Sequence, residues 1–158
     1  MSRPLPFPTA AAGRQPQRAR VLDFLRLLWA IDHGLQRRSK RMERELGVTG
    51  VQRLVIRVVG QYPSITPGHL AGILHLHPST VTGVVQRLHR DGFLLRSIDR
   101  SDGRRWLLTL TPRGLAIDRR RQGTVEAVLE KALARLQPHE VVAARRALAA
   151  VGEQLSES

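Results

Sequence analysis

The chain of 158 residues contains no cysteine, and this absence excludes several classes of protein at once. Disulfide scaffolds, zinc–thiolate sites and thiol-based redox switches all require cysteine. Aromatic residues are also scarce, at 4% of the sequence, so the core must consist mainly of aliphatic side chains. No apolar run approaches the roughly 20 residues that a membrane-spanning helix needs, and the N-terminus has no hydrophobic signal core. These absences predict a cytoplasmic protein with an aliphatic core.

Acidic residues are few compared with basic ones. Lys plus Arg number 26 and Asp plus Glu number 13, which gives a formal net charge of +13 at pH 7. Lysine itself is rare, because only Lys40 and Lys131 occur among these basic side chains. A guanidinium binds phosphate bidentately and can hydrogen-bond guanine, although a GC-rich coding bias would produce the same preference for arginine. The charge predicts a polyanionic partner.

The sequence also lacks the motifs of enzymes. It has no phosphate-binding loop, dinucleotide fingerprint, Ser-His-Asp order or carboxylate pair at a credible spacing. His75 and His77 are the most suggestive pair of metal ligands, but a metal site needs three or four convergent ligands and no clustered carboxylate accompanies them. We therefore expect a protein that is not an enzyme and that holds no metal or cofactor.

The apolar pattern predicts a mainly helical chain. Apolar side chains between residue 18 and Leu46 recur at steps of three and four and stop at Gly47, which indicates one long amphipathic helix. Three shorter helices follow, each opened by a side chain that can cap the first turn. Their capping residues are Thr49, Thr66 and His77. Pro63 and Gly92 are expected to end the first and the last of these three helices.

The two ends of the chain have different characters. Residues 1–17 are rich in Pro, Ala and Arg and contain no acid, which predicts a mobile basic tail. At the other end, Thr111 followed by a proline predicts the start of one long helix that runs to about Leu136. A last helix is expected from Pro138. The apolar stripes of the first and last helices have no obvious partner within one chain, so dimerisation would bury them.

Residues 93–110 are expected to form a two-stranded hairpin with a charged tip. Its strands are predicted over 93–98 and 106–110, with Gly103 at the turn. Most charged turns are simply solvated. Here the tip concentrates three arginines, more than stability requires, and Asp99 and Asp102 are interpreted as ion-pair partners that hold those arginines in place. Two short helices followed by such a hairpin make a winged helix-turn-helix.

The fourth helix has the two faces that a recognition helix needs. An apolar stripe can pack on the scaffold, and a small polar face can enter a major groove about 12 Å wide. The short hydroxyl side chains near its N-terminus allow close approach to DNA. Gln86 can read adenine and Arg87 guanine, or either can hold phosphate. The expected DNA contacts are Ser79, Thr80, Thr82, Gln86, Arg87 and Arg90 on the helix and Arg100, Arg104 and Arg105 at the hairpin tip.

The segments HPSTVTGVVQRLHRDGFLLR and SDGRRWLLTLTPRG resemble the multiple antibiotic resistance regulator (MarR) family over about residues 20–155. The resemblance implies a mainly α fold, a winged helix-turn-helix with long N- and C-terminal dimerisation helices and a two-stranded β wing. It also implies an ion pair between Asp102 and Arg104 at the wing, with Arg104 in the minor groove. Gly83 departs from the family pattern, because many members carry a large polar or basic residue there. The implied divisions are a tail (1–17), an N-terminal dimerisation helix (18–47), a DNA-binding region (48–113) and C-terminal dimerisation helices (114–158).

The same resemblance implies a function. It predicts a ligand-responsive repressor that binds a pseudo-palindromic operator in double-stranded DNA as a homodimer, with recognition helices about 34 Å apart. Members of the family often bind aromatic acids, so a small aromatic or anionic effector is expected, with Trp29 and His33 as candidate contacts. Ordinary core packing is the competing interpretation of these two residues. The competing function is a sequence-independent architectural DNA-binding protein, which the charge alone would permit.

Overall fold

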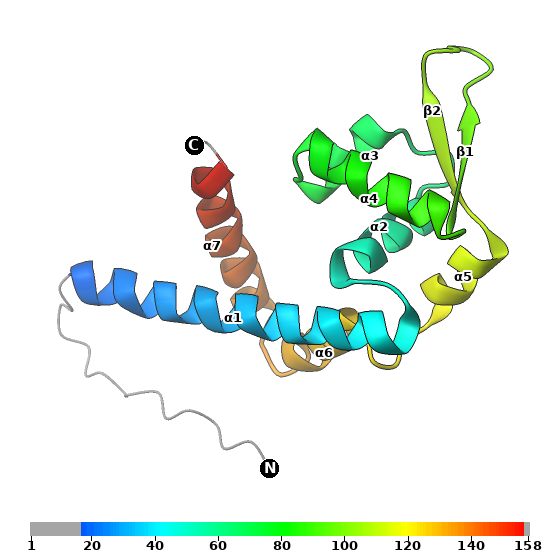
Figure 1. Cartoon of the computed structure of the whole chain (residues 1–158). Coiled ribbons are helices and arrows are strands. Elements are labelled where there is room, and N and C mark those ends of the chain that lie inside the picture. Colours follow the sequence, from blue (N-terminus) through cyan, green and yellow to red (C-terminus); the bar gives the residue numbers. More distant parts are fainter. Residues whose placement is uncertain (1–16, 157–158) are drawn as a thin grey trace. The chain divides into compact units, whose positions relative to one another are not determined.

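The computed structural model describes residues 17–156, and Figure 1 shows its helices and its single hairpin. In chain order the elements are α1 (Gln17–Leu46), α2 (Gly50–Gln61), α3 (Pro67–Leu74), α4 (Pro78–Arg90), β1 (Leu94–Ile98), β2 (Trp106–Leu110), α5 (Pro112–Arg119), α6 (Val125–Leu133) and α7 (Pro138–Ser156). The predicted mainly helical class with a two-stranded wing is confirmed. Apart from Gln17, the predicted basic tail lies outside the described residues. The chain divides into two units, 1–34 and 35–158, and each is described by itself.

The capping residues open their helices as the sequence predicts. The side chain of Thr49 accepts a hydrogen bond from the backbone N–H of Gln52, and the Gln52 side chain accepts from the backbone of Thr49 at 2.8 Å. This reciprocal capping box satisfies two donors that the first turn of α2 would otherwise leave unpaired. Thr66 and Thr111 cap α3 and α5 by accepting from the backbone N–H of His69 and of Gly114, and each is followed by proline at the first helical position.

The hydrophobic core of the larger unit lies in the winged helix-turn-helix. Its buried side chains come from α2, α3, α4 and both strands, and they are almost all aliphatic, as the shortage of aromatics predicts. Those with no exposed area include Val55, Ile56, Leu70, Leu88 and Leu108. Because α2, α3 and α4 share this core, the recognition helix is held on a packed scaffold.

The hairpin is antiparallel, as predicted, and its strands β1 and β2 fall within the two predicted strand ranges. Leu94 lies opposite Leu110, and Ile98 lies opposite Trp106. Ile65, in the loop before α3, forms a further bridge with Leu108 of β2. The base of the hairpin is thereby tied to the helices, and its tip extends beyond them (Figure 1).

Gly114, in the first turn of α5, occupies a position where no side chain fits. A Cβ atom at this position would lie 2.2 Å from the carbonyl oxygen of Phe93. That carbonyl accepts a hydrogen bond from the backbone N–H of Thr111 at 3.1 Å, so it is held at the junction between the hairpin and α5. Only a residue without a side chain allows α5 to begin this close to the start of β1.

The predicted long helix from Thr111 to about Leu136 is wrong. The structure breaks it into α5 and α6, which are separated by residues 120–124. Gly123 has a φ of +78°, a left-handed conformation that interrupts a helix, and Thr124 starts α6 by accepting from the N–H of Ala127 at 3.3 Å. The sequence signal for the break, a glycine followed by a capping threonine, was present but was overridden by the apolar periodicity.

Candidate nucleic-acid interface

The polar face of α4 is exposed as the sequence predicts. Val81, Val85 and Leu88 are buried on one side of the helix. The opposite side carries the predicted contacts, all of them exposed: Ser79, Thr80, Thr82, Gln86, Arg87 and Arg90. The helix lies against the hairpin, since the Nδ1–H of His89 can donate to the carbonyl of Leu94 at 3.0 Å. The structure therefore places the predicted recognition helix next to the predicted wing (Figure 1).

The N-terminus of α4 uses a histidine cap. The backbone N–H of Ser79 donates to Nδ1 of His77 at 3.3 Å, and the Ser79 hydroxyl oxygen lies 2.7 Å from the same nitrogen. Thr82 donates its hydroxyl hydrogen to the carbonyl of Pro78 at 2.9 Å. The Ser79 hydroxyl is thus engaged in the cap, whereas the Thr82 oxygen keeps its acceptor capacity toward a base edge.

Of the two arginines on the polar face of α4, only the one at the end of the helix forms an ion pair among the described residues. Arg90 is paired with Asp91, with Nε and Oδ1 3.1 Å apart. Arg87 forms no ion pair with any residue between 17 and 156. Gly83 stands on the same side of the helix, and a Cβ there would meet nothing within 4 Å. The absence of a side chain at Gly83 leaves the helix backbone open to close approach by a partner.

The wing ion pair forms with a different arginine from the one expected. Nε of Arg105 lies 2.9 Å from Oδ2 of Asp102, whereas Arg104 contributes only its backbone N–H, 3.2 Å from Oδ1 of Asp102. The cause is a tight turn in which the N–H of Arg105 donates to the carbonyl of Asp102 at 2.8 Å. That turn returns Arg105 to the side of Asp102 and places Arg104 at the bend. The expected Asp102–Arg104 pair is corrected to Asp102–Arg105.

Asp99 orders the other half of the tip without an ion pair among the described residues. Its carboxylate accepts from the Ser101 hydroxyl at 2.7 Å and from the Ser101 backbone N–H at 2.8 Å. These hydrogen bonds, chiefly that of the hydroxyl, hold the pKa of Asp99 below its usual value. The expectation that Asp99 pairs with an arginine is therefore wrong, because the nearer serine donors satisfy the carboxylate.

Two arginines at the tip are left without partners by this arrangement. Arg100 and Arg104 are exposed, and within residues 17–156 neither side chain forms a hydrogen bond or an ion pair. Arg105 is also exposed, but its charge is offset by Asp102. The wing therefore presents two uncompensated cations and one compensated cation.

Sequence reasoning missed two arginines that hold the wing. The guanidinium of Arg96 lies 4.6 Å from the centre of the Trp106 ring, and that of Arg113 lies 4.4 Å from the centre of the Phe93 ring. Arg113 also donates to the carbonyl of Asp91 at 2.9 Å. Cation–π contacts of this kind stiffen a hairpin and its base. Ile98 pairs with Trp106, so Arg96, two residues earlier on β1, lies diagonally across from Trp106 on the same face of the hairpin. Once the strands are paired in this way, the Arg96–Trp106 contact can be expected.

The candidate effector contacts Trp29 and His33 both lie on α1 and are exposed in the single chain. Trp29 is 67% exposed, so it is not packed into a core here. Their role in binding an effector stays a prediction. Residues 17–156 contain no group of three or more potential metal-ligating His, Cys, Asp or Glu side chains. None of the described helices is both long and apolar enough to span a membrane.

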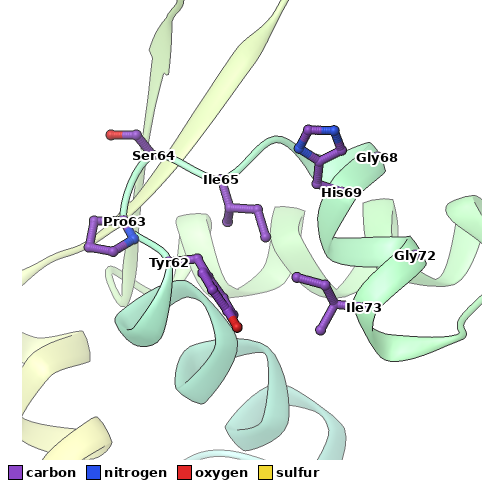
Figure 2. Close-up of a pocket in the computed structure, with 8 residues that line it drawn as sticks. All are labelled: Tyr62, Pro63, Ser64, Ile65, Gly68, His69, Gly72 and Ile73. Carbon is purple, nitrogen blue, oxygen red and sulfur yellow. The ribbon is translucent and has the colours of Figure 1, made fainter.

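A hollow of about 500 Å³ lies at the corner between α2 and α3 and contains none of the predicted site residues. Figure 2 shows Tyr62, Ile65 and Ile73 bordering one space, with His69 above them. Tyr62 and Ile73 are each nearly half exposed. The hollow is therefore an open surface feature, separate from the residues that α4 and the wing bring together.

Comparison with known proteins finds a family match. Residues 48–106 match the family model described as MarR family. Over these residues the chain is similar to the MarR family. The matched residues run from the residue before the Thr49 cap to the first residue of β2, so they include the whole of α4 and the tip of the wing.

The comparison also finds a similar transcriptional repressor and similar solved structures. An HTH-type transcriptional repressor of Mycobacterium tuberculosis (strain ATCC 25618 / H37Rv) is 32% identical over 91 residues, which are 58% of this chain and 66% of that protein. The aligned part thus spans just under two thirds of that relative. The Staphylococcus aureus MepR–DNA complex has a TM-score of 0.70 at 19% identity, covering 84% of this chain and 97% of that one. PcaV from Streptomyces coelicolor, solved with its natural ligand, has a TM-score of 0.68 at 24% identity, covering 89% and 97%. At these identities the two structures show a shared fold.

Proposed function

We propose that this chain is a sequence-specific DNA-binding transcriptional regulator of the MarR family, acting as a repressor and not as an enzyme. One observation carries the proposal: the exposed polar side of α4 lies beside a wing whose tip leaves Arg100 and Arg104 without partners among the described residues. A helix that fits the major groove and a thin cationic hairpin are the two parts with which a winged helix-turn-helix holds DNA.

In the proposed complex, the two parts have different tasks. Thr82 and Gln86 on α4 contact base edges in the major groove, and Arg87 contacts guanine or phosphate. Arg104 enters the minor groove, where a narrow A·T-rich segment concentrates negative potential, and Arg100 holds phosphate. Arg105 contributes less, because Asp102 offsets its charge. A regulator of this kind represses by occupying its operator.

The active form is proposed to be a homodimer assembled through α1, α6 and α7. No residue of α6 is buried in the single chain, and Val128, Leu129 and Leu133 are each at least 40% exposed. Apolar side chains on α1 and α7 are exposed as well, including Phe24, Leu148 and Leu155. A symmetric dimer would bury these faces and place two recognition helices about one turn of DNA apart, which matches a pseudo-palindromic operator.

A small aromatic or anionic effector is proposed to release the DNA, with Trp29 and His33 as contacts. The likeness to PcaV, which was solved with its natural ligand, supports this proposal. Because the chain has only two tryptophans, Trp29→Phe leaves Trp106 as the sole indole. If an aromatic acid quenches the fluorescence of the protein but not that of Trp29→Phe, the site is at Trp29; equal quenching of both argues against it.

Selection of bound sequences from random double-stranded DNA tests the main proposal. We expect an enriched pseudo-palindrome whose half-sites are centred about 10 base pairs apart or a multiple of that spacing. A sequence-independent architectural protein would retain DNA without enriching any motif. That outcome would replace the proposed function with the architectural alternative.

A further inference from the structure

The bend between α5 and α6 is held by a side chain from another helix. Arg53 lies in α2 and is only 2% exposed, although it carries a permanent charge. Its guanidinium donates to the backbone carbonyls of Ile117, Asp118 and Arg120, the last two at 3.2 and 2.6 Å. These carbonyls belong to the last turn of α5 and its C-cap residue, where a helix leaves acceptors unpaired and its dipole favours a cation.

The same arginine also holds the first turn of α6. Nε of Arg53 lies 3.0 Å from Oε1 of Glu126, and Nε of Arg57, one turn later in α2, lies 3.9 Å from the same oxygen. Arg57 additionally donates to Oδ1 of Asp118 at 2.7 Å. One buried guanidinium therefore joins the end of α5, the start of α6 and the first turn of α2.

Apolar packing does not fix the direction of α6 within this chain. None of its side chains is buried. Its ion pairs with the rest of the larger unit join Glu126 to Arg53 and Arg57, and Glu130 to Arg121 at 4.0 Å, all within its first two turns. The second carboxylate oxygen of Glu126 is buried and has no hydrogen-bond partner among the described residues, so the charge of Glu126 is balanced mainly by Arg53. Loss of Arg53 would leave a partly buried carboxylate without its main partner.

We propose that Arg53 is a positioning residue that fixes the α5–α6 bend and thereby the separation of the two winged units on operator DNA. The inference rests on the proposed function, because α6 is one of the helices through which the dimer is expected to form. A bivalent protein binds its complete site much more tightly than one half only if both halves are reached at the same time. A change in the direction of α6 would remove that advantage without altering α4 or the wing.

The test combines two measurements on the full chain. Arg53→Met keeps an unbranched side chain but removes all four hydrogen bonds. The matched control is Arg41→Met, which breaks an exposed ion pair with Glu45 on α1. Because the chain has no native cysteine, Gln61→Cys on α2 and Lys131→Cys on α6 can carry spin labels, with excess unlabelled chain added so that only distances within one subunit are measured.

We expect Arg53→Met to broaden the distance distribution between the two labels by about twofold and to weaken binding to the selected full operator by about tenfold or more. Binding to a single half-site should stay within about twofold of the parent protein. Arg41→Met should change neither measurement. An unchanged distance distribution, or equal losses on the half-site and the full operator, would overturn the proposal.

Failure of Arg53→Met to fold and failure of the parent chain to select a DNA motif have different consequences. If Arg53→Met does not fold, Glu126→Gln replaces it, because that variant removes the ion pair and leaves the three carbonyl contacts of Arg53 in place. A smaller broadening is then expected, and an unchanged distribution would contradict the role of Arg53. If the parent chain selects no DNA motif, the proposed function fails, while the label distances still decide whether Arg53 fixes the bend.

Discussion

At the tip of the wing, one turn decides which arginine is neutralised and which is available to DNA. Asp102 accepts from the backbone of Arg104 and pairs with the side chain of Arg105. The carboxylate therefore shapes the turn as well as carrying a charge. These two roles predict opposite effects on DNA affinity when Asp102 is replaced.

Asp102→Ala is expected to weaken operator binding by about 1 kcal/mol, because the turn loses the acceptor that orients Arg104. Asp102→Asn keeps an acceptor oxygen and removes only the charge, so it should bind at least as tightly as the parent chain. Fluorescence anisotropy with labelled operator at fixed salt measures both. Tighter binding by Asp102→Ala, with unchanged thermal stability, would mean that the tip is only a cationic patch.

Base reading is expected to depend on Thr82 and Gln86. Replacing either with Ala should cost about 1–3 kcal/mol on the selected operator and little on random DNA, because a base contact carries sequence information that a phosphate contact does not. Competition binding with the two DNAs gives the ratio directly. Equal losses on both DNAs would remove the base-reading role.

Gly114 is a residue whose constraint is purely steric. Gly114→Ala should destabilise the fold by about 1–3 kcal/mol, because the new Cβ would overlap the Phe93 carbonyl. Gly72→Ala in α3 is the control, since a Cβ there meets nothing within 4 Å and alanine favours helix. Urea denaturation compares the two. A Gly114→Ala protein as stable as the parent would show that α5 can begin elsewhere.

At the scale of elements, α4 and the wing are built differently. The spacing of its apolar residues gives the helix a buried side and an exposed side. The buried side packs in the hydrophobic core. The wing has only two strands and relies on local contacts, including the Arg96–Trp106 stack and the hydrogen bonds of Asp99 and Asp102. The charge that the wing presents therefore depends on these local pairs.

The three arginines of the wing tip should contribute unequally to DNA binding. Arg100→Ala should lower the salt slope of log K by about one unit, and Arg105→Ala by less, because Asp102 already offsets the charge of Arg105. Arg104→Ala should weaken binding most on operators with A·T-rich flanks. Titrations at several salt concentrations separate these effects. Equal slopes for all three variants would contradict the assignment of partners.

At the scale of the whole molecule, the single chain leaves much apolar surface uncovered. The exposed apolar side chains of α1, α6 and α7 are too many for an isolated monomer of this size to leave in water without consequence. Together with a net charge of +13, they favour a protein that binds itself through one surface and a polyanion through another.

The dimer is therefore expected to persist without DNA. Sedimentation at micromolar concentration should give a single species of twice the chain mass. Leu129→Glu together with Leu148→Glu should shift it toward monomer, because each places a charge in the proposed apolar interface. A parent chain that sediments as a monomer would contradict the proposed assembly.

Features set by neighbouring residues were predictable from the sequence. The caps at Thr49, Thr66 and Thr111, the buried side of α4 and the two strands of the hairpin all follow from local hydrogen bonding and from the spacing of apolar side chains. Such features need no knowledge of distant contacts, because a cap or an apolar stripe is complete within one or two turns. The same local rules placed all nine predicted DNA contacts on exposed positions.

Tertiary structure decided the burial of Arg53 and how the break at residues 120–124 is held. Gly123 and Thr124 mark the break in the sequence, but nothing local shows that an arginine more than sixty residues earlier takes the carbonyls at the end of α5. The partner of Asp102 was decided in the same way, by the fold of a turn and not by the order of the arginines. Charge and hydrogen-bond partners depend on distances in space, whereas the sequence reports distances along the chain, and here the two differ most at the bend and at the wing tip.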